Sequence, residues 1–261
     1  MDKERLLSHL RGEDERRIGD HVLGLAKLAW ETNKPQVTDF YDPYQQQVAR
    51  SVLGSIPEVG VLVQGGYKQA ERARLVVYPQ FYVMSAIQSP LRVLEAKGNF
   101  SFHNVGHGDF LGSLLATGLD RDKIGDIIVL PSGCQAIVAA EVADYLLSNW
   151  TRVHQVSVDV QEIDEEQLSV EPERIKEIRT TVASLRLDAI AAGGYGTSRS
   201  KIAREIKAEK LKLNWKPVTN PALSVTEGDV LSLRGRGRVV VSEIGGKTRK
   251  GRTTVVLHRY Y

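Results

Sequence analysis

The sequence has a single cysteine, Cys134, so the chain cannot form an internal disulfide or a zinc site built from several cysteines. Cys134 lies in an apolar segment, and we expect a buried, unreactive thiol there. No apolar run approaches the roughly 18 residues that a membrane-spanning helix needs. The opening residues, 1–17, carry charges of both signs. These features predict a soluble, unexported protein without membrane insertion, located in the cytoplasm.

Motifs of common catalytic sites are also missing. The sequence has no Walker loop and no Gly-x-Ser-x-Gly elbow, and the glycines at 235 and 237 are not framed by the strand and long helix of a dinucleotide site. His103, His107 and Asp109 form the one group that resembles a metal site, but intervening glycines favour a loop there. A capped helix start open to an anion is the alternative. We expect no catalytic residue, no metal and no cofactor.

Charge is divided unevenly along the chain. Residues 182–261 hold 16 Lys and Arg against 6 Asp and Glu, a net charge of +10. The other 181 residues hold 19 basic and 26 acidic residues, a net charge of −7. This asymmetry is typical of nucleic-acid or acidic-surface binding confined to the C-terminal part. A solvated basic face is the alternative.

The pattern of apolar residues predicts an α+β protein in several parts. Helical spacing over residues 1–70 predicts a helical N-terminal domain. Residues 71–165 alternate strands and helices, with strands expected at 73–79 and 81–88, and predict a ferredoxin-like (RRM-like) domain. Its central strands lack the aromatic residues that stack bases in RNA-recognition domains. The polar, acidic stretch 161–174 is predicted to be a surface connection and residues 175–184 to be extended, so residues 166–181 are expected to form a linker or extended segment.

Residues 182–261 contain the most specific spacing. A short helix, a Gly-rich turn at 193–197 and a helix over 199–210 are expected, and two strands over 238–244 and 253–261 should form a hairpin. Strand alternation would place Arg234, Arg236 and Arg238 on one face, with the intervening glycines allowing close approach of an RNA backbone. Guanidinium groups bind phosphates in pairs of hydrogen bonds. The four cations of the hairpin loop, 245–252, belong either to this contact or to a solvated loop.

Part of this segment resembles the RNA-binding module named after small-subunit ribosomal protein S-four. The matching residues run in order over about fifty positions: Arg186-Leu187-Asp188, Ser198-Arg199, Ala203, Ile206, Leu213-Asn214, Pro221, Val225, Gly228-Asp229 and Val230. In that family a two-helix basic face lies against structured RNA. The resemblance implies an S-four (αL-type) module with a β-hairpin extension over residues 182–261. It implies RNA contact by Arg186, Ser198, Arg199, Lys201 and Arg204. The remaining candidates for RNA contact are the basic residues Lys207, Lys212, Arg234, Arg236 and Arg238.

Three further segments, 65–79, 107–127 and 232–241, resemble hallmarks of YlmH-type proteins, and this resemblance covers nearly the whole chain. The sequence is similar to the cyanobacterial and plastid branch, named for photosystem II. Bacterial relatives are associated with ribosomes and with rescue of stalled large-subunit peptidyl-tRNA complexes. The resemblance therefore implies a non-catalytic protein that binds structured rRNA or tRNA on the large subunit, without DNA specificity. The alternative is a photosystem II assembly or regulatory factor acting through protein partners of the acidic N-terminal domains.

S-four modules are also fused to pseudouridine synthases, and Arg186-Leu187-Asp188 superficially resembles the aspartate motif of those enzymes. The continuation typical of that motif is missing here, so Asp188 is not expected to be catalytic.

Overall fold

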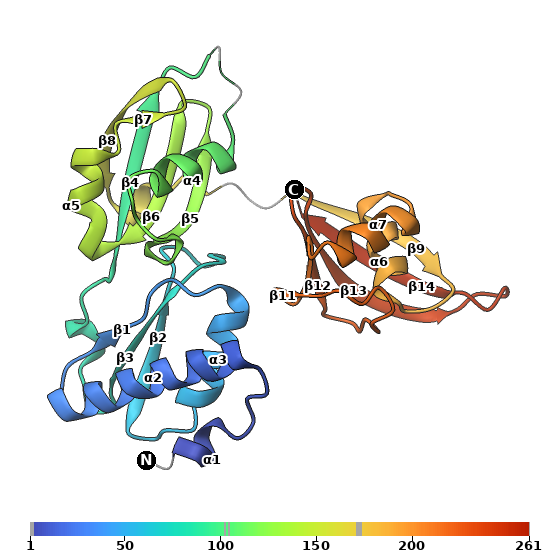
Figure 1. Cartoon of the computed structure of the whole chain (residues 1–261), viewed down its shortest axis with the longest axis horizontal. Coiled ribbons are helices and arrows are strands. Elements are labelled where there is room, and N and C mark those ends of the chain that lie inside the picture. The colour runs from blue at the N-terminus through green and yellow to red at the C-terminus, as the bar shows by residue number, and fades with distance from the viewer. Residues whose placement is uncertain (1–2, 102, 104, 171–173, 261) are drawn as a thin grey trace. The chain divides into compact units, whose positions relative to one another are not determined.

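The computed structural model describes residues 3–101, 103, 105–170 and 174–260. The chain divides into two compact units, unit 1 over 1–170 and unit 2 over 171–261 (Figure 1). The helices of unit 1 are α1 (Lys3–Leu7), α2 (Glu13–Thr32), α3 (Pro43–Leu53), α4 (His107–Leu115) and α5 (Ala140–Asn149). Its strands are β1 (Gln36–Val37), β2 (Val59–Gln64), β3 (Arg74–Pro79), β4 (Leu91–Gly98), β5 (Ile124–Leu130), β6 (Gly133–Ala139), β7 (Arg152–Val153) and β8 (Val156–Ile163).

The N-terminal part of unit 1 is not purely helical, contrary to the prediction for residues 1–70. Antiparallel strands β1, β3 and β2 form a sheet in that order, and α2 packs against β3. Strand β3 was expected in the middle domain, but it lies at the centre of this sheet, where Leu75, Val76 and Val77 are fully buried. The sequence of a fully buried strand does not show which strands it pairs with, because both of its faces are apolar.

The predicted strand at 81–88 is wrong. Residues 84–86 form a short 3₁₀ helix, and Phe81, Val83 and Met84 are more than half exposed. Aromatic and β-branched residues favour a strand only where a neighbouring strand can pair with it.

The middle of unit 1 has the predicted ferredoxin-like order. β4, α4, β5, β6, α5 and β8 follow one another, and the antiparallel sheet has the strand order β5-β6-β4-β8-β7. Its core contains Leu94, Phe110, Leu146 and Trp150. Cys134 is also fully buried, as predicted, and burial raises the pKa of its thiol.

A buried arginine joins the two sheets of unit 1. Arg74 Nε donates to Thr38 O at 2.7 Å, and its Nη1 donates to Pro90 O at 2.8 Å. The same guanidinium binds both carboxylate oxygens of Glu141, at 2.7 and 2.9 Å. Desolvation opposes ionisation of Glu141, but the hydrogen bonds from Arg74 prevail and lower the pKa of the carboxyl group to about 2.

This ion pair predicts acid sensitivity of unit 1. Because the pKa of Glu141 is lower in the folded chain than its ordinary value of 4.5, the pair stabilises the fold above that value and loses its effect as pH falls toward about 2. We expect Glu141→Gln to lower the melting temperature at pH 7 and to flatten its decline between about pH 5 and pH 3. Thermal melts across that range check this, with Glu31→Gln, on the exposed face of α2, as the control. A decline as steep as in the wild type would contradict it.

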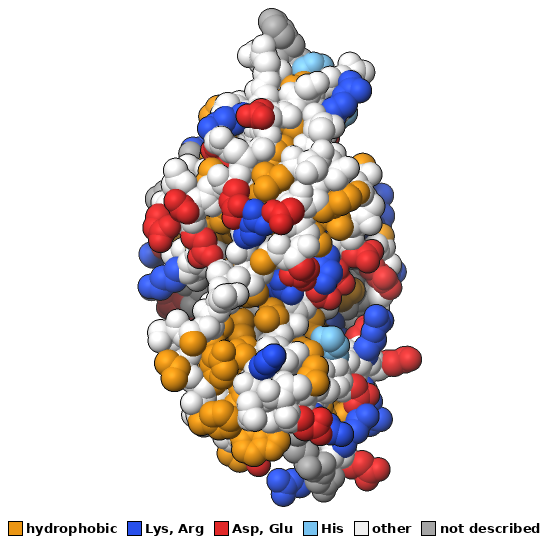
Figure 2. Space-filling model, turned by 90° about the vertical axis from the view of Figure 1, so that its left-hand side faces the viewer, with side chains coloured by type: hydrophobic (Ala, Val, Ile, Leu, Met, Phe, Trp, Pro, Cys, Tyr) orange, Lys and Arg blue, Asp and Glu red, His pale blue; other side chains and the backbone are white. Residues whose placement is uncertain are grey.

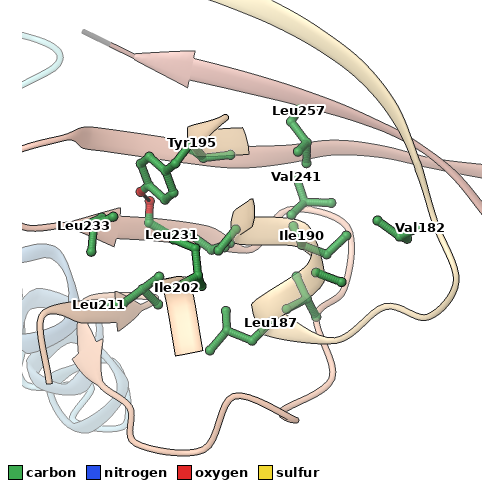
Figure 3. Close-up of a cluster of buried hydrophobic side chains, with 14 of the residues drawn as sticks. Val182, Leu187, Ile190, Tyr195, Ile202, Leu211, Leu231, Leu233, Val241 and Leu257 are labelled. Carbon is green, nitrogen blue, oxygen red and sulfur yellow. Dashed lines mark hydrogen bonds between the residues drawn. The ribbon is translucent and has the colours of Figure 1, made fainter. Parts of the chain in front are cut away.

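Unit 2 is an antiparallel six-stranded sheet in the order β11-β10-β12-β13-β14-β9, with two helices. The helices are α6 (Leu187–Tyr195) and α7 (Arg199–Lys207). The strands are β9 (Ile175–Val182), β10 (Leu211–Leu213), β11 (Lys216–Pro217), β12 (Val230–Leu233), β13 (Gly237–Lys247) and β14 (Thr253–Tyr260). Leucine, isoleucine and valine side chains from both helices and the sheet meet in one core (Figure 3).

The segment 166–181, predicted to be a linker or extended segment, is extended from Ile175 onward, where it forms a strand of unit 2. β9 pairs with β14 along its whole length, from Ile175 opposite Tyr260 to Val182 opposite Thr253. Residues 171–173 of that segment lie outside the described residues. Polar composition suggested a linker, but an edge strand exposes one side to water and tolerates many polar residues.

The predicted Gly-rich turn at 193–197 is mostly helix. Gly193 and Gly194 belong to α6, which ends at Gly196 with a φ of 61°. A Cβ atom on Gly194 would lie 2.7 Å from Cγ1 of Val239 on β13. Gly194 therefore allows α6 to pack closely on the sheet, and only Gly196 serves the turn.

Among the described residues, no helix is long and apolar enough to cross a membrane.

Candidate nucleic-acid interface

Helix α7 begins at a serine cap and buries one face. The Ser198 hydroxyl accepts a hydrogen bond from the Lys201 N–H at 3.3 Å. Ile202 and Ile206, four residues apart, are fully buried in the core of unit 2. Their burial fixes which side of α7 faces solvent.

Three exposed cations lie on the outer side of α7. At about 100° per residue, Arg204 lies opposite the buried isoleucines, and Lys201 and Lys207 lie about 60° to either side of it. Among the described residues, no acidic side chain forms an ion pair with any of the three. Their charges are consequently available to a ligand, and a row of this kind suits the phosphates of an RNA backbone.

The two remaining arginines near α7 converge on one carboxylate. Nη2 of Arg199 donates to both oxygens of Asp188 at 2.9 Å, and Arg186 donates through Nε and Nη2 at 3.2 Å. The Asp188 side chain is 9% exposed, whereas those of Arg186 and Arg199 are 43% and 52% exposed. Desolvation opposes ionisation of Asp188, but the two arginines prevail and lower the pKa of its carboxyl group.

The aspartate thus has a positioning role. It orients two half-exposed guanidinium groups at the starts of α6 and α7, while cancelling one of their two charges.

Removing the charge of Asp188 should therefore affect stability more than RNA binding. We expect Asp188→Asn to destabilise unit 2 by about 2 kcal/mol at pH 7, because two charge-assisted interactions are lost. RNA affinity should stay within about threefold of the wild type, since the variant gains net positive charge. Urea unfolding and RNA titration of the same preparation check both expectations. Unchanged stability would contradict the positioning role.

Arg234, Arg236 and Arg238 do not share a face of a strand, contrary to the prediction. Residues 234–236 form a turn between β12 and β13, in which the Arg236 N–H donates to Leu233 O at 2.9 Å. Gly235 and Gly237 have φ values of 76° and 75°. The turn requires glycine at both positions, since other residues rarely adopt such a φ.

The arginine turn, residues 234–236, lies next to the end of α7. The Arg234 N–H donates to Lys210 O at 3.1 Å, and Leu233 pairs with Leu211 directly after that lysine. Arg234 is exposed and Arg236 is partly buried. Tertiary structure therefore brings the turn beside the segment that follows α7, although more than twenty residues separate them in sequence.

Aromatic side chains support the strand that follows this turn. The Tyr195 hydroxyl donates to the carbonyls of Leu231 and Gly237, at 2.8 and 3.1 Å. Arg238 lies over the ring of Tyr260, 4.7 Å from its centroid. Arg238 therefore packs on the sheet and is less available to RNA than the prediction assumed.

Lys212 is also a predicted RNA-binding residue. It is half-buried on β10, where it pairs with Ser232 on one side and Pro217 on the other.

Sequence reasoning missed the parts played by Asp188, Tyr195 and Lys210. Asp188 was noted as a match to the S-four module and rejected as a catalyst, but its ion pairs with Arg186 and Arg199 were not predicted. Lys210 was counted on the helix, but it lies beyond the end of α7, where its carbonyl binds the arginine turn. No local signal shows that Tyr195 reaches β12 and β13.

Unit 1 carries a different kind of surface. Asp109 accepts a hydrogen bond from the Gly106 N–H at 2.8 Å and pairs with His154 at 3.0 Å. No group of three His, Cys, Asp or Glu side chains suited to a metal ion occurs among the residues that the structure describes. Hydrophobic side chains gather over the part that holds the N-terminal sheet (Figure 2). Trp30 and Phe81, both about half exposed or more, make an edge-to-face contact at 6.2 Å. Exposed apolar groups of this kind are typical of protein contacts.

Three family models match successive parts of the chain. "YlmH, N-terminal" matches residues 14–82, "Putative RNA-binding domain in YlmH" matches 89–167, and "S4 domain" matches 185–231. "Ribosome-associated protein quality control protein P2" of Bacillus subtilis (strain 168) is 34% identical over 254 residues, which cover 97% of this chain and 98% of that protein. The solved structure "Cell division protein ylmH from Streptococcus pneumoniae" is similar to this chain with a TM-score of 0.51 and 18% sequence identity. The similar region covers 61% of this chain and 97% of that structure, and at this identity the likeness supports the fold alone.

Proposed function

Because this chain belongs to the YlmH family, we propose that it binds structured RNA of the ribosome, rRNA or tRNA, through the basic surface of unit 2. The observation that carries the proposal is the exposed face of α7, where Lys201, Arg204 and Lys207 have no acidic partner among the described residues. The match of residues 185–231 to an S4 domain agrees with this site. Protein and RNA would associate without a catalysed reaction, since the site offers charge and hydrogen-bond donors.

The large subunit is the partner that we propose. The similar Bacillus protein is named for ribosome-associated quality control, and this chain matches almost its entire length. We therefore include a role in ribosome-associated quality control in the proposal for this chain. Membership of the cyanobacterial and plastid branch stays a prediction, as does RNA contact by the individual residues predicted from the sequence.

Sedimentation with purified ribosomal subunits tests the proposal. We expect the protein to migrate with large subunits at low salt and to dissociate as salt is raised, because each neutralised phosphate adds about 0.7 to 0.9 to the slope of log affinity against log salt. Crosslinking and sequencing of the bound RNA then identify the contact. Binding to small subunits alone would contradict the choice of subunit.

Migration at the top of the gradient, without enriched RNA crosslinks, would contradict RNA binding itself. That result would favour the alternative, a photosystem II factor that acts through protein partners of unit 1. The exposed Trp30 and Phe81 are the side chains to replace in a search for such partners.

A further inference from the structure

We propose that the tip of the β13–β14 hairpin, residues 247–252, is a second RNA-phosphate contact of unit 2, separate from the α7 face. The inference rests on the proposed function and extends it to residues outside the S4 domain match, which ends at 231. The turn that joins β13 to β14 extends past the last residue pair of β9 and β14, because that pairing reaches Thr253, the first residue of β14 (Figure 1). The tip therefore projects without a third strand beside it.

The tip has a defined conformation. The Thr248 N–H donates to Arg252 O at 2.7 Å, and the Gly251 N–H donates back to Thr248 O at 2.8 Å. Gly251 has a φ of 73°, which suits glycine in this tight loop. Below the loop, the Thr254 hydroxyl donates to Gly246 O at 3.0 Å. A loop ordered in this way loses less conformational entropy on binding a ligand than a flexible one.

The cations of the tip divide into two kinds. Arg252 folds back onto β9, where its Nε donates to the Thr181 hydroxyl at 2.9 Å. Lys247, Arg249 and Lys250 are exposed, and none of the three forms an ion pair within the described part of the chain; the nearest acidic contact on β13 is that of Glu227, which accepts from the Ile244 N–H at 3.1 Å. Arg252 consequently holds the loop on the sheet, and the other three form a patch of unbalanced positive charge. Phosphate oxygens are the ligands that such a patch attracts most strongly.

The spacing of the two basic sites is fixed by one strand. β13 begins directly after the arginine turn, at Gly237, and ends at Lys247 in the tip. Eleven residues of strand at about 3.3 Å each separate the two sites by roughly 30 Å. An RNA that contacts both must therefore be long, whereas a short RNA can occupy one site at a time. This geometry favours extended structured RNA over a single small anion.

Two stem-loop RNAs of different length test the inference with the full chain. Their stems have about 8 and about 20 base pairs, on either side of the 16 or so that a duplex-binding domain covers. We expect Arg249→Ala with Lys250→Ala to weaken binding of the long RNA by roughly three- to tenfold and to reduce its salt slope by about 1.5. Binding of the short RNA should change less than twofold. Lys176→Ala, an exposed cation on β9, is the control, with no expected effect.

Each other outcome has a clear meaning. Wild-type affinity of the double variant for the long RNA would overturn the second contact. Equal losses on both RNAs would overturn the proposed spacing. If the wild-type chain bound neither stem-loop nor ribosomal particles, the proposed function itself would fail. Loss of binding in α7 variants, with none in the tip variant, would leave the proposed function standing without the second contact.

Discussion

Replacing Lys201, Arg204 and Lys207 together with alanine is expected to weaken RNA binding by about a hundredfold, with little change in stability. The three side chains are exposed on α7 and lack acidic partners among the described residues, so their loss removes phosphate contacts without breaking ion pairs. Alanine favours helix, and exposed substitutions usually change stability by at most about 0.5 kcal/mol. RNA titration at several salt concentrations measures the loss, and the slope against log salt should fall by about 2 to 3.

A matched variant separates the α7 face from overall charge. Arg16, Arg17 and Lys27 are three exposed cations on α2 in unit 1, and their replacement by alanine changes the net charge equally. We expect this α2 variant to bind RNA with nearly wild-type affinity. If both triple variants lost affinity to the same extent, long-range attraction rather than contact at α7 would explain the binding.

Replacing Gly194 with valine is expected to unfold unit 2 or to destabilise it by about 3 kcal/mol or more. A Cβ atom at this position would lie 2.7 Å from Cγ1 and 3.0 Å from Cγ2 of Val239. Both residues are buried between α6 and β13, and the valine side chain is too stiff to move aside. The helix must therefore shift from the sheet, and the turn that Tyr195 fixes would shift with it. Urea unfolding and RNA titration measure the two consequences.

Gly24→Ala is the matched control for Gly194, because Gly24 lies in the exposed side of α2 with no atom within 4 Å of its Cβ position. It is expected to stabilise the chain by about 0.5 to 1 kcal/mol. A double-mutant cycle of Gly194→Ala with Val239→Ala supplies a second check, since shortening the valine makes room for the new methyl group. Strictly additive effects in that cycle would contradict the close contact as the cause.

Local patterns in the sequence already determined much of the middle domain and of α7. The order of strands and helices from β4 to β8 follows from alternating short β-branched and helical runs, because periods of two and of 3.6 residues identify strands and helices without reference to distant residues. The buried isoleucines of α7 and its opposite cationic face follow in the same way. The division of charge identified unit 2 as the basic part.

Tertiary structure alone decided which elements are partners. The central place of β3 in the N-terminal sheet, the addition of β9 to the edge of unit 2 and the position of the arginine turn beside the segment that follows α7 depend on pairing between distant residues. The same holds for Arg186 and Arg199, whose predicted freedom to bind RNA is limited by Asp188. The physical reason is that periodicity records only which side of an element is apolar. Packing across the whole unit decides which element covers the apolar side and which oppositely charged group a side chain contacts.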